Sequence, residues 1–241
     1  MRRTNGTYLR SRPINGLFDG VIDELLGTSA PGVRETRAVL RHMAGVAREP
    51  HEDDHSECPP TGMKTFTVMA PYRPPLSSLI IAAKYDAISE PWQVLGHRLG
   101  LELAARCEWV HSSVPPIVLP APSPRWRSWH RGIDHTALLA SSVAGCLGTR
   151  ARRWIRGDWR TPQAMRTRRG RASVADSIAP SLSWWGSRFL ARRRRLVGNQ
   201  PVVVIDDVCT TGATMEACAA TLGRMGFVSI HGAVISRCTR D

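Results

Sequence analysis

The stretch PVVVIDDVCTTGAT, Pro201 to Thr214, decides how this chain folds. It opens on consecutive β-branched residues, Val202 to Ile205, which predict a strand buried on both faces, because helices cover both sides of a parallel sheet. The strand ends in Asp206 and Asp207. Since ligands of open α/β sheets bind outside the carboxyl ends of strands, the stretch predicts an α/β fold with a ligand site at this point.

The turn after the two acids consists of small and hydroxyl-bearing residues, and a helix is predicted to begin directly after it. Its members are Thr210, Thr211, Gly212, Ala213 and Thr214. They supply hydroxyls and backbone N–H groups, and the helix dipole points at the same place, so the turn is a candidate phosphate site. Because the acids repel a bare phosphate, the expected ligand carries hydroxyls or a metal ion beside its phosphate, as a ribose 5-phosphate does.

Other phosphate-binding motifs do not fit this segment. A Walker loop requires Gly-Lys-Ser/Thr at the turn, and no Lys is present. A dinucleotide fingerprint requires three spaced glycines, and only Gly212 occurs. The remaining alternative is purely structural: a strand that ends in acidic residues and is followed by an N-capped helix. Packing alone does not explain why two adjacent acids stand at the end of a buried strand.

The segment resembles the 5-phosphoribosyl 1-pyrophosphate (PRPP) motif of the type I phosphoribosyltransferases, from the apolar strand to Thr214. The resemblance implies that Asp206 and Asp207 hold the ribose 2- and 3-hydroxyls with Mg²⁺ nearby. It also implies that the turn wraps the 5-phosphate. We therefore expect the type I phosphoribosyltransferase fold, an open, mainly parallel twisted sheet flanked by helices.

Hydrophobic patterns predict the other elements of this fold. We expect strands at 64–69, 117–119 and 228–235, and helices at 76–84, 91–105, 137–147 and 213–225. Asp134 is a candidate N-cap and Gly226 a candidate C-cap. A right-handed crossover places the last strand beside the PRPP strand. We interpret Lys84 as a favourable charge at the C-terminus of its own helix.

Three further segments narrow the resemblance. Y-x-P-P-L-x-x-L-I-x-x-x-K-Y-D (72–86), P-x-P-S (120–123) and R-G-x-D-H (131–135) precede the PRPP motif in an order similar to that of the ComF family. These phosphoribosyltransferase-like proteins are named for competence and DNA uptake. The likeness covers residues 65 to 238, and the PRPP motif is its most specific part.

The loop between 120 and 135 is a candidate second anion site, because a strand, a basic loop and a helix follow one another there. The ComF resemblance implies that Ala121, Ser123, Arg131 and Gly132 take pyrophosphate. An ordinary basic surface loop is the alternative.

The chain departs from the ComF pattern in two places. Many ComF proteins begin with a four-cysteine zinc module, whereas only Cys58 stands in that region here, so zinc is not expected. His51 and His55 nearby do not complete a closed zinc site, which requires four ligands. The segment after Thr161 and Gln163 does not match the family, which leaves acceptor recognition undefined.

Most of the basic charge lies in one segment, Arg150 to Arg195. It holds fourteen arginines and two aspartates, so twelve of the thirteen net positive charges of the chain fall there. Three interpretations stay open. In the first, the segment is a loop that closes over PRPP during catalysis. In the second, its Arg and Trp side chains bind single-stranded DNA. In the third, its Trp residues pack on the core and its Arg residues are solvated.

The length of 241 residues is enough for one main domain. We expect an N-terminal extension of helix and loop over 1–62 and a phosphoribosyltransferase-like domain over 63–241. No apolar stretch is long enough to span a membrane, and the scattered cysteines lack a C-x-x-C motif, which favours a cytoplasmic protein. The sequence leaves open whether the protein forms a homodimer.

Together these patterns favour a Mg²⁺-dependent phosphoribosyltransferase in which a nitrogen nucleophile displaces pyrophosphate from PRPP. In this hypothesis Asp206 and Asp207 orient the ribose, and either could assist proton transfer. The alternative is a non-catalytic protein that senses PRPP and binds single-stranded DNA in DNA uptake or regulation. A third hypothesis is an inactive relic with a structural role.

Overall fold

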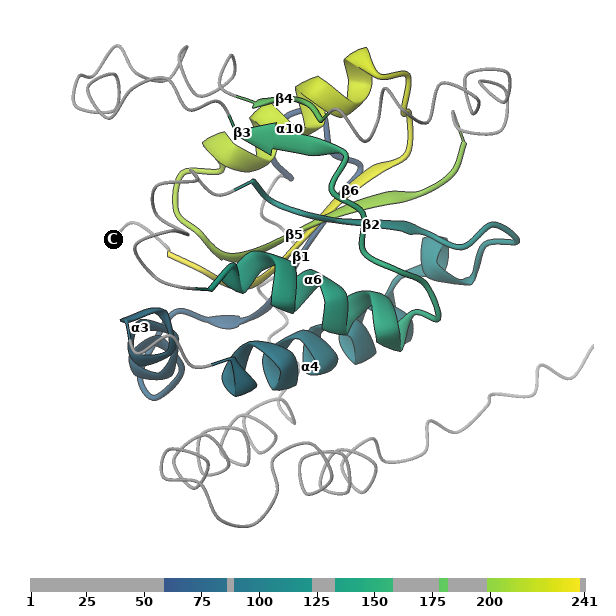
Figure 1. The fold of residues 1–241 in the computed structure, drawn as a ribbon. Helices are drawn as coiled ribbons and strands as arrows, with labels where there is room; N and C mark the ends of the chain where they lie inside the picture. The colour runs from purple at the N-terminus through teal and green to yellow at the C-terminus, as the bar shows by residue number, and fades with distance from the viewer. Residues whose placement is uncertain (1–58, 86–88, 123–132, 158–177, 182–198, 239–241) are drawn as a thin grey trace, which may run out of the picture.

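A four-stranded parallel sheet forms the centre of the protein (Figure 1). The computed structural model describes residues 59–85, 89–122, 133–157, 178–181 and 199–238. The strands are β1 (Thr65–Pro71), β2 (Ile117–Pro120), β5 (Val202–Cys209) and β6 (Ile230–Arg237), in the order β1-β6-β5-β2. This arrangement confirms the predicted α/β class, is consistent with the type I phosphoribosyltransferase fold, and sets β6 beside β5.

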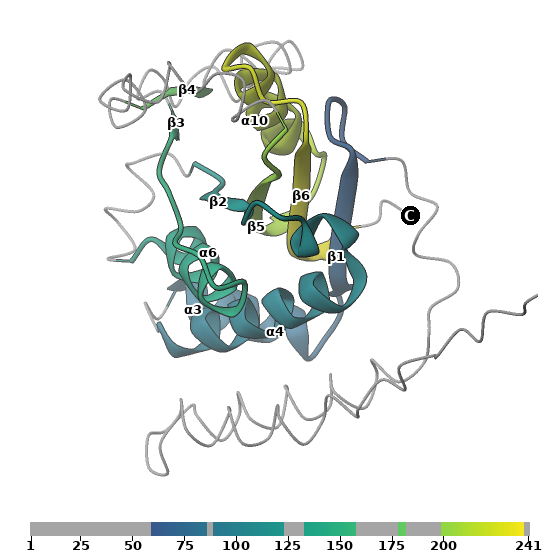
Figure 2. The ribbon, with the colours of Figure 1, turned by 90° about the vertical axis from the view of Figure 1, so that its right-hand side faces the viewer.

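Helices cover both faces of the sheet (Figure 2). The helices α3 (Leu76–Tyr85), α4 (Glu90–Arg106) and α6 (His135–Cys146) lie on one side and α10 (Ala213–Arg224) on the other. The side chains of β5 alternate between the two resulting cores. Val203 and Ile205 pack with α3, α4 and α6, whereas Val202 and Val204 pack with α10. The prediction of a strand buried on both faces is confirmed.

Two glycines let α4 approach α6 closely. A Cβ on Gly96 would lie 2.6 Å from the carbonyl oxygen of Leu139 and 2.8 Å from the Cβ of Ser142. A Cβ on Gly100 would lie 2.6 Å from the Cβ of Cys146. Because no real side chain tolerates such distances, this spacing of the helices depends on glycine at both positions.

The predicted element positions agree with the observed ones to within about two residues, which is the normal uncertainty of element ends. Asp134 caps α6, since its Oδ1 accepts a hydrogen bond from the amide of Ala137 at 3.2 Å. Gly226 adopts a left-handed φ of 99° just after α10. A short 3-10 helix, η1 (Glu108–His111), which we did not predict, precedes β2.

A second, antiparallel pair of strands lies within the Arg-rich segment: β3 (Ile155–Gly157) and β4 (Ile178–Pro180). The buried hydroxyl of Thr221 ties this pair to α10, because it donates a hydrogen bond to the carbonyl of Ile178 at 3.1 Å. We did not predict these strands, because each is only three residues long and too short for a hydrophobic pattern.

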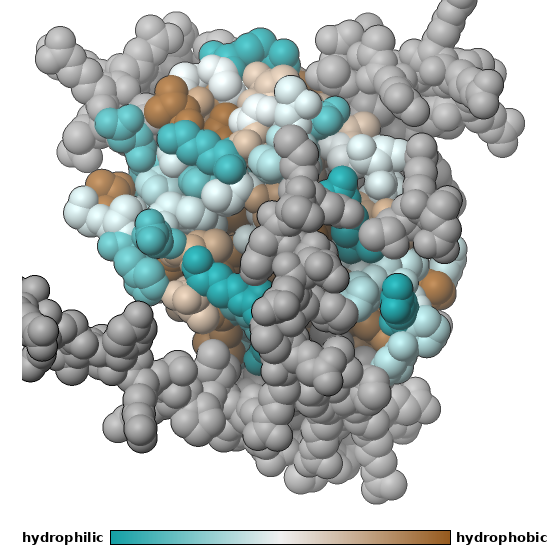
Figure 3. Space-filling view, turned by 180° about the vertical axis from the view of Figure 1, so that it is seen from behind, coloured by the Kyte–Doolittle hydropathy of each residue, from teal (hydrophilic) through white to brown (hydrophobic). Residues whose placement is uncertain are grey.

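The surface of the described part mixes polar and apolar residues. Seen from behind, hydrophilic and hydrophobic residues are interspersed (Figure 3). The large apolar side chains exposed among the described residues are Ile81, Tyr85, Val114 and Val228. No helix within the described ranges is both long and apolar enough to cross a lipid bilayer.

Candidate functional site

The carboxyl ends of β2 and β5 meet at one edge of the sheet, on the left in Figure 1 together with the start of α6. Pro120 is paired with Ile205, and the amide of Ala121 donates to the carbonyl of Ile205 at 2.8 Å. The next residue of β5 is Asp206. The fold therefore brings the first residue of the predicted pyrophosphate loop next to the first acid of the predicted ribose site.

Asp207 is the most thoroughly bound side chain of this edge. Its Oδ2 contacts Lys84 Nζ at 2.5 Å and His135 Nε2 at 3.1 Å. Its Oδ1 accepts a hydrogen bond from the amide of Val208 at 2.7 Å. Only 6% of the residue is exposed. One carboxylate thus joins the last turn of α3, the first turn of α6 and the end of β5.

The surroundings of Asp207 favour its ionised form. Burial by itself raises the pKa of Asp207, but the hydrogen bond from His135 and the charge of Lys84 outweigh it and lower the pKa below its ordinary value. The His135 ring rests against Trp92, which is fully buried in α4, with 5.0 Å between ring centroids. Packing therefore orients the imidazole that binds Asp207.

Asp206 has different surroundings, because adjacent side chains of a strand point to opposite faces of the sheet. It follows the alternation of Val204 toward α10, and its charge contributes to raising the pKa of the buried Cys218 thiol in that helix. Asp206 Oδ1 accepts a hydrogen bond from the amide of Asp207 at 2.9 Å. Among the described residues, no Lys, Arg or His lies within ion-pair distance of Asp206.

Burial and the neighbouring charge of Asp207 raise the pKa of Asp206 well above its ordinary value. The residue as a whole is only partly buried, unlike Asp207 beside it. A partly buried carboxylate that no cation of the described residues pairs gains most from a hydroxyl donor or a cation supplied by a ligand.

The turn after β5 combines two exposed threonines with a buried glycine, Gly212. Thr210 and Thr211 are exposed, and no backbone acceptor within the described ranges binds their amides. Gly212 has a left-handed φ of 79°, which most side chains disfavour, and α10 begins at the next residue. The amide of Ala213 donates to Thr211 Oγ1 at 3.4 Å, so that hydroxyl turns toward the helix N-terminus. These features have the chemistry of an anion-binding turn.

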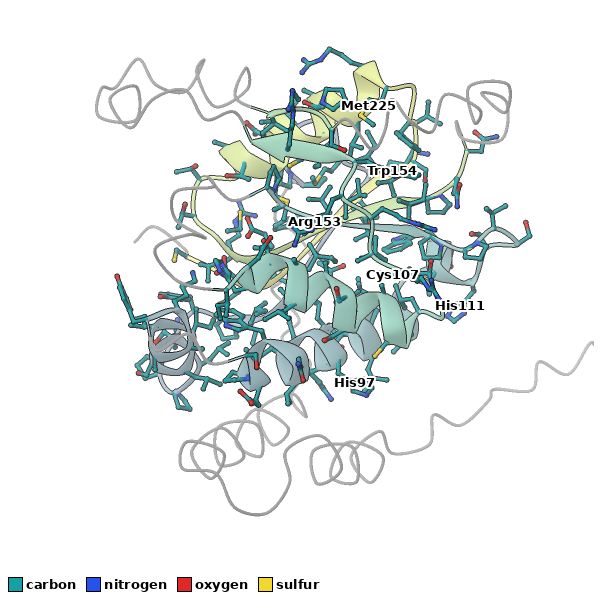
Figure 4. All side chains as sticks on the ribbon, viewed as in Figure 1. His97, Cys107, His111, Arg153, Trp154 and Met225 are labelled. Atoms are coloured by element: carbon teal, nitrogen blue, oxygen red, sulfur yellow. The ribbon has the colours of Figure 1, made fainter. Side chains whose placement is uncertain are left out.

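The start of α6 is held at the end of β2. The Thr136 hydroxyl lies 3.1 Å from both the Ala121 carbonyl and Asp134 Oδ1. Arg153, labelled in Figure 4, contacts Asp134 Oδ2 at 2.8 Å and thereby ties the Arg-rich segment to the same helix. Of the predicted pyrophosphate residues, only Ala121 is described, whereas Ser123, Arg131 and Gly132 lie outside the described residues.

Magnesium, which the PRPP motif implies, finds a suitable donor in Asp206. Mg²⁺ prefers carboxylate oxygens and normally retains water and substrate phosphates, so a single carboxylate is sufficient. Both oxygens of Asp207 already have protein partners. Within the described part of the chain, no group of three or more His, Cys, Asp or Glu residues could hold a metal ion by itself.

Comparison with known proteins adds independent support for part of this assignment. No family model matches the chain. The chain is similar to DNA utilization proteins. The proteins named DNA utilization protein YhgH from Shigella flexneri and Escherichia coli strain K12 are each 28% identical over 173 residues, which cover 72% of this chain and 71% of theirs. The protein of that name from Salmonella typhimurium is 25% identical over the same length. These relatives support the resemblance to the ComF family.

Two residues of this edge, Lys84 and His135, were not predicted as site residues. Lys84 lies in the last turn of α3, as predicted, and its ammonium also forms an ion pair with Asp207 that the sequence did not indicate. In the sequence, His135 was recognised only as the final residue of the R-G-x-D-H motif. A Lys that ends an apolar helix and a His that begins one are both common in structural roles, so the signal lies in the long-range contact and not in the local sequence.

The Arg-rich segment is described only in part. Trp154 packs on Phe227 with 6.1 Å between ring centroids, which supports core packing for this one Trp. Trp159, Trp184 and Trp185 lie outside the described residues, as do the predicted extension up to 58 and the candidate metal ligands His51, His55 and Cys58. The closing-loop and DNA-binding interpretations therefore stay predictions.

Proposed function

We propose that this ComF-like protein binds Mg²⁺-PRPP and displaces pyrophosphate from it with a nitrogen nucleophile. The observation that carries the proposal is the position of Asp206. It is a partly buried acid beside a turn that holds two exposed threonines and leads directly into the start of α10. A sugar phosphate has hydroxyls for the first feature and a phosphate for the second.

Each part of the site has a chemical task in this proposal. The turn from Thr210 to Thr214 binds the 5-phosphate, and Asp206 accepts hydrogen bonds from the ribose hydroxyls. During transfer the bond from the anomeric carbon to the pyrophosphate oxygen breaks and a bond to nitrogen forms. The carboxylate of Asp206 stabilises the positive charge that develops on the ribose. Bound Mg²⁺ would offset the charge of the leaving pyrophosphate.

The second anion site of the proposal lies at the end of β2. The amide and carbonyl of Ala121 are fixed by Ile205 and Thr136, so the loop that follows leaves from a rigid position. We propose that this loop, with Ser123, Arg131 and Gly132, receives the pyrophosphate. Because it starts next to Asp206, the two anions of PRPP would bind on either side of the reacting carbon.

A second function is favoured by the relatives, whose name refers to the use of DNA. In this alternative a cytoplasmic protein senses PRPP and holds single-stranded DNA through the segment from Arg150 to Arg195. The basic charge concentrated there supports it, since phosphate contacts by Arg dominate non-specific binding to nucleic acid. Its role would then lie in DNA uptake or regulation.

Two assays separate these functions. The first measures pyrophosphate release from Mg²⁺-PRPP with a panel of nucleobases and glutamine, with Asp206→Asn as the matched inactive variant. The second measures the affinity for single-stranded oligonucleotides between low and moderate salt. Release that disappears in Asp206→Asn supports the transferase, and salt-steep DNA binding without release supports the sensor. If neither assay responds, both proposals fail.

A further inference from the structure

The two neighbouring acids of β5 differ in how much of their hydrogen-bonding capacity the protein already uses. Asp207 Oδ2 forms ion pairs with Lys84 and His135, its Oδ1 accepts a hydrogen bond from the amide of Val208, and the residue is buried on the face that α3 and α6 cover. Asp206 Oδ1 accepts a hydrogen bond from the amide of Asp207, and no Lys, Arg or His of the described ranges forms an ion pair with it. A ligand that approached Asp207 directly would have to displace the Lys84 or His135 side chain.

We infer that Lys84 and His135 are positioning residues, which fix Asp207 as the anchor of this edge and leave Asp206 as the carboxylate that contacts the sugar phosphate. The role of Asp206 rests on the proposed function, whereas the anchoring role of Asp207 does not.

The anchor joins three elements that each carry part of the site. Lys84 ends α3, His135 begins α6 directly after the predicted pyrophosphate loop, and Asp207 directly follows Asp206. Trp92 from α4 supports the His135 ring from the side. A displacement of Asp207 would therefore move the start of α6 and the end of β5 relative to each other, and with them the two proposed anion sites.

The anchor also changes the charge that a phosphate meets. Two ionised acids at the strand end would oppose an incoming phosphate with two negative charges. The ammonium of Lys84, 2.5 Å from Asp207 Oδ2, offsets one of them. Lys84 thus lets an acid pair and a phosphate-binding turn coexist in one site.

A double-mutant cycle tests the anchor. The variants are Lys84→Met, Asp207→Asn, and both together, with urea unfolding followed by circular dichroism. Lys84→Met leaves the buried Asp207 carboxylate with His135 alone as its ion-pair partner, and Asp207→Asn removes the carboxylate that the half-buried Lys84 ammonium contacts. We therefore expect the folding equilibrium constant to fall at least about tenfold in each. The double variant removes both charges and should lose far less than the product of the two single losses. Lys84→Arg should retain most of the stability. Lys64→Met, at an exposed Lys, should change it little.

The same variants are titrated with Mg²⁺-PRPP by calorimetry under conditions in which they are folded. Lys84→Met should bind PRPP at least about tenfold more weakly, because the charge of Asp207 is no longer offset. Lys84→Arg should restore the affinity. The double variant should bind more tightly than Lys84→Met, which a purely structural role of Lys84 would not produce.

The outcomes distinguish this inference from the proposed function. If wild-type protein does not bind PRPP, the proposed function fails, and the stability cycle still decides the anchor. If the two single losses in stability are additive, or if Lys84→Arg does not recover what Lys84→Met loses, the inference is wrong. If Asp207→Asn abolishes PRPP binding as Asp206→Asn does and leaves stability unchanged, the inference is also wrong while the proposed function stands. If Asp207→Asn does not fold while Asp206→Asn does, the anchor is supported.

Discussion

Replacing Gly96 by alanine should destabilise the protein, although alanine is the better helix former. Gly96 lies within α4 at the contact with α6, where the added Cβ would sit 2.6 Å from the Leu139 carbonyl oxygen and 2.8 Å from the Ser142 Cβ. Because the first of these atoms is backbone, the helices must move apart. Overpacking of this kind costs about 1–3 kcal/mol, against a gain of about 1 kcal/mol in helix propensity.

The net loss of up to about 2 kcal/mol corresponds to a fall of up to roughly 8 °C in the unfolding midpoint for a protein of this size. Gly145 in α6 and Gly223 in α10 are matched controls, since a Cβ at either position meets nothing within 4 Å. Their alanine variants should raise the midpoint by about 1–4 °C. Thermal unfolding by circular dichroism measures all three variants. A Gly96→Ala variant stabilised as much as the Gly145→Ala and Gly223→Ala controls would refute the close helix contact.

Three further predictions concern single side chains. Asp206→Asn should raise the unfolding midpoint of the unliganded protein, because burial and the charge of Asp207 raise the pKa of Asp206 and make its ionisation costly in the folded state; a lowered midpoint in differential scanning calorimetry would contradict this. Burial lowers the pKa of His231 to about 4, so stability should fall by about 1–3 kcal/mol as the pH drops from 6.5 to 4, where the unfolded chain binds a proton that the folded one does not. Urea unfolding across this range should show the loss, and His231→Gln should reduce it. Thr221→Val should cost about 1 kcal/mol in urea unfolding, because it leaves the Ile178 carbonyl without the Thr221 hydroxyl; no loss would contradict the link between α10 and the β3–β4 pair.

The sequence predicted those features that depend on local patterns. The run of β-branched residues from Val202 to Ile205 predicted a doubly covered strand, and the structure has one core on each of its faces. Helix ends followed from single residues such as Asp134, whose side chain caps α6. The right-handed crossover rule predicted β6 beside β5, which the register confirms.

The long-range contacts of the site could not be predicted in this way. The ion pair of Lys84 with Asp207 joins residues from α3 and β5, and nothing in the local pattern of either element specifies the partner. Strand alternation, however, was available from the sequence. It places Asp206 and Asp207 on opposite faces, and so indicates that two adjacent acids need not share one task.

The central claim is that a sugar phosphate binds between Asp206 and the turn that begins α10. Calorimetric titration of the wild-type protein and of Asp206→Asn with Mg²⁺-PRPP tests it most directly. The account predicts saturable binding to the wild type and at least about tenfold weaker binding to the folded variant, since a carboxylate that accepts hydrogen bonds from ribose hydroxyls is worth about 1.5–3 kcal/mol. Equal affinity of the two proteins would contradict it, as would the absence of binding to the wild type.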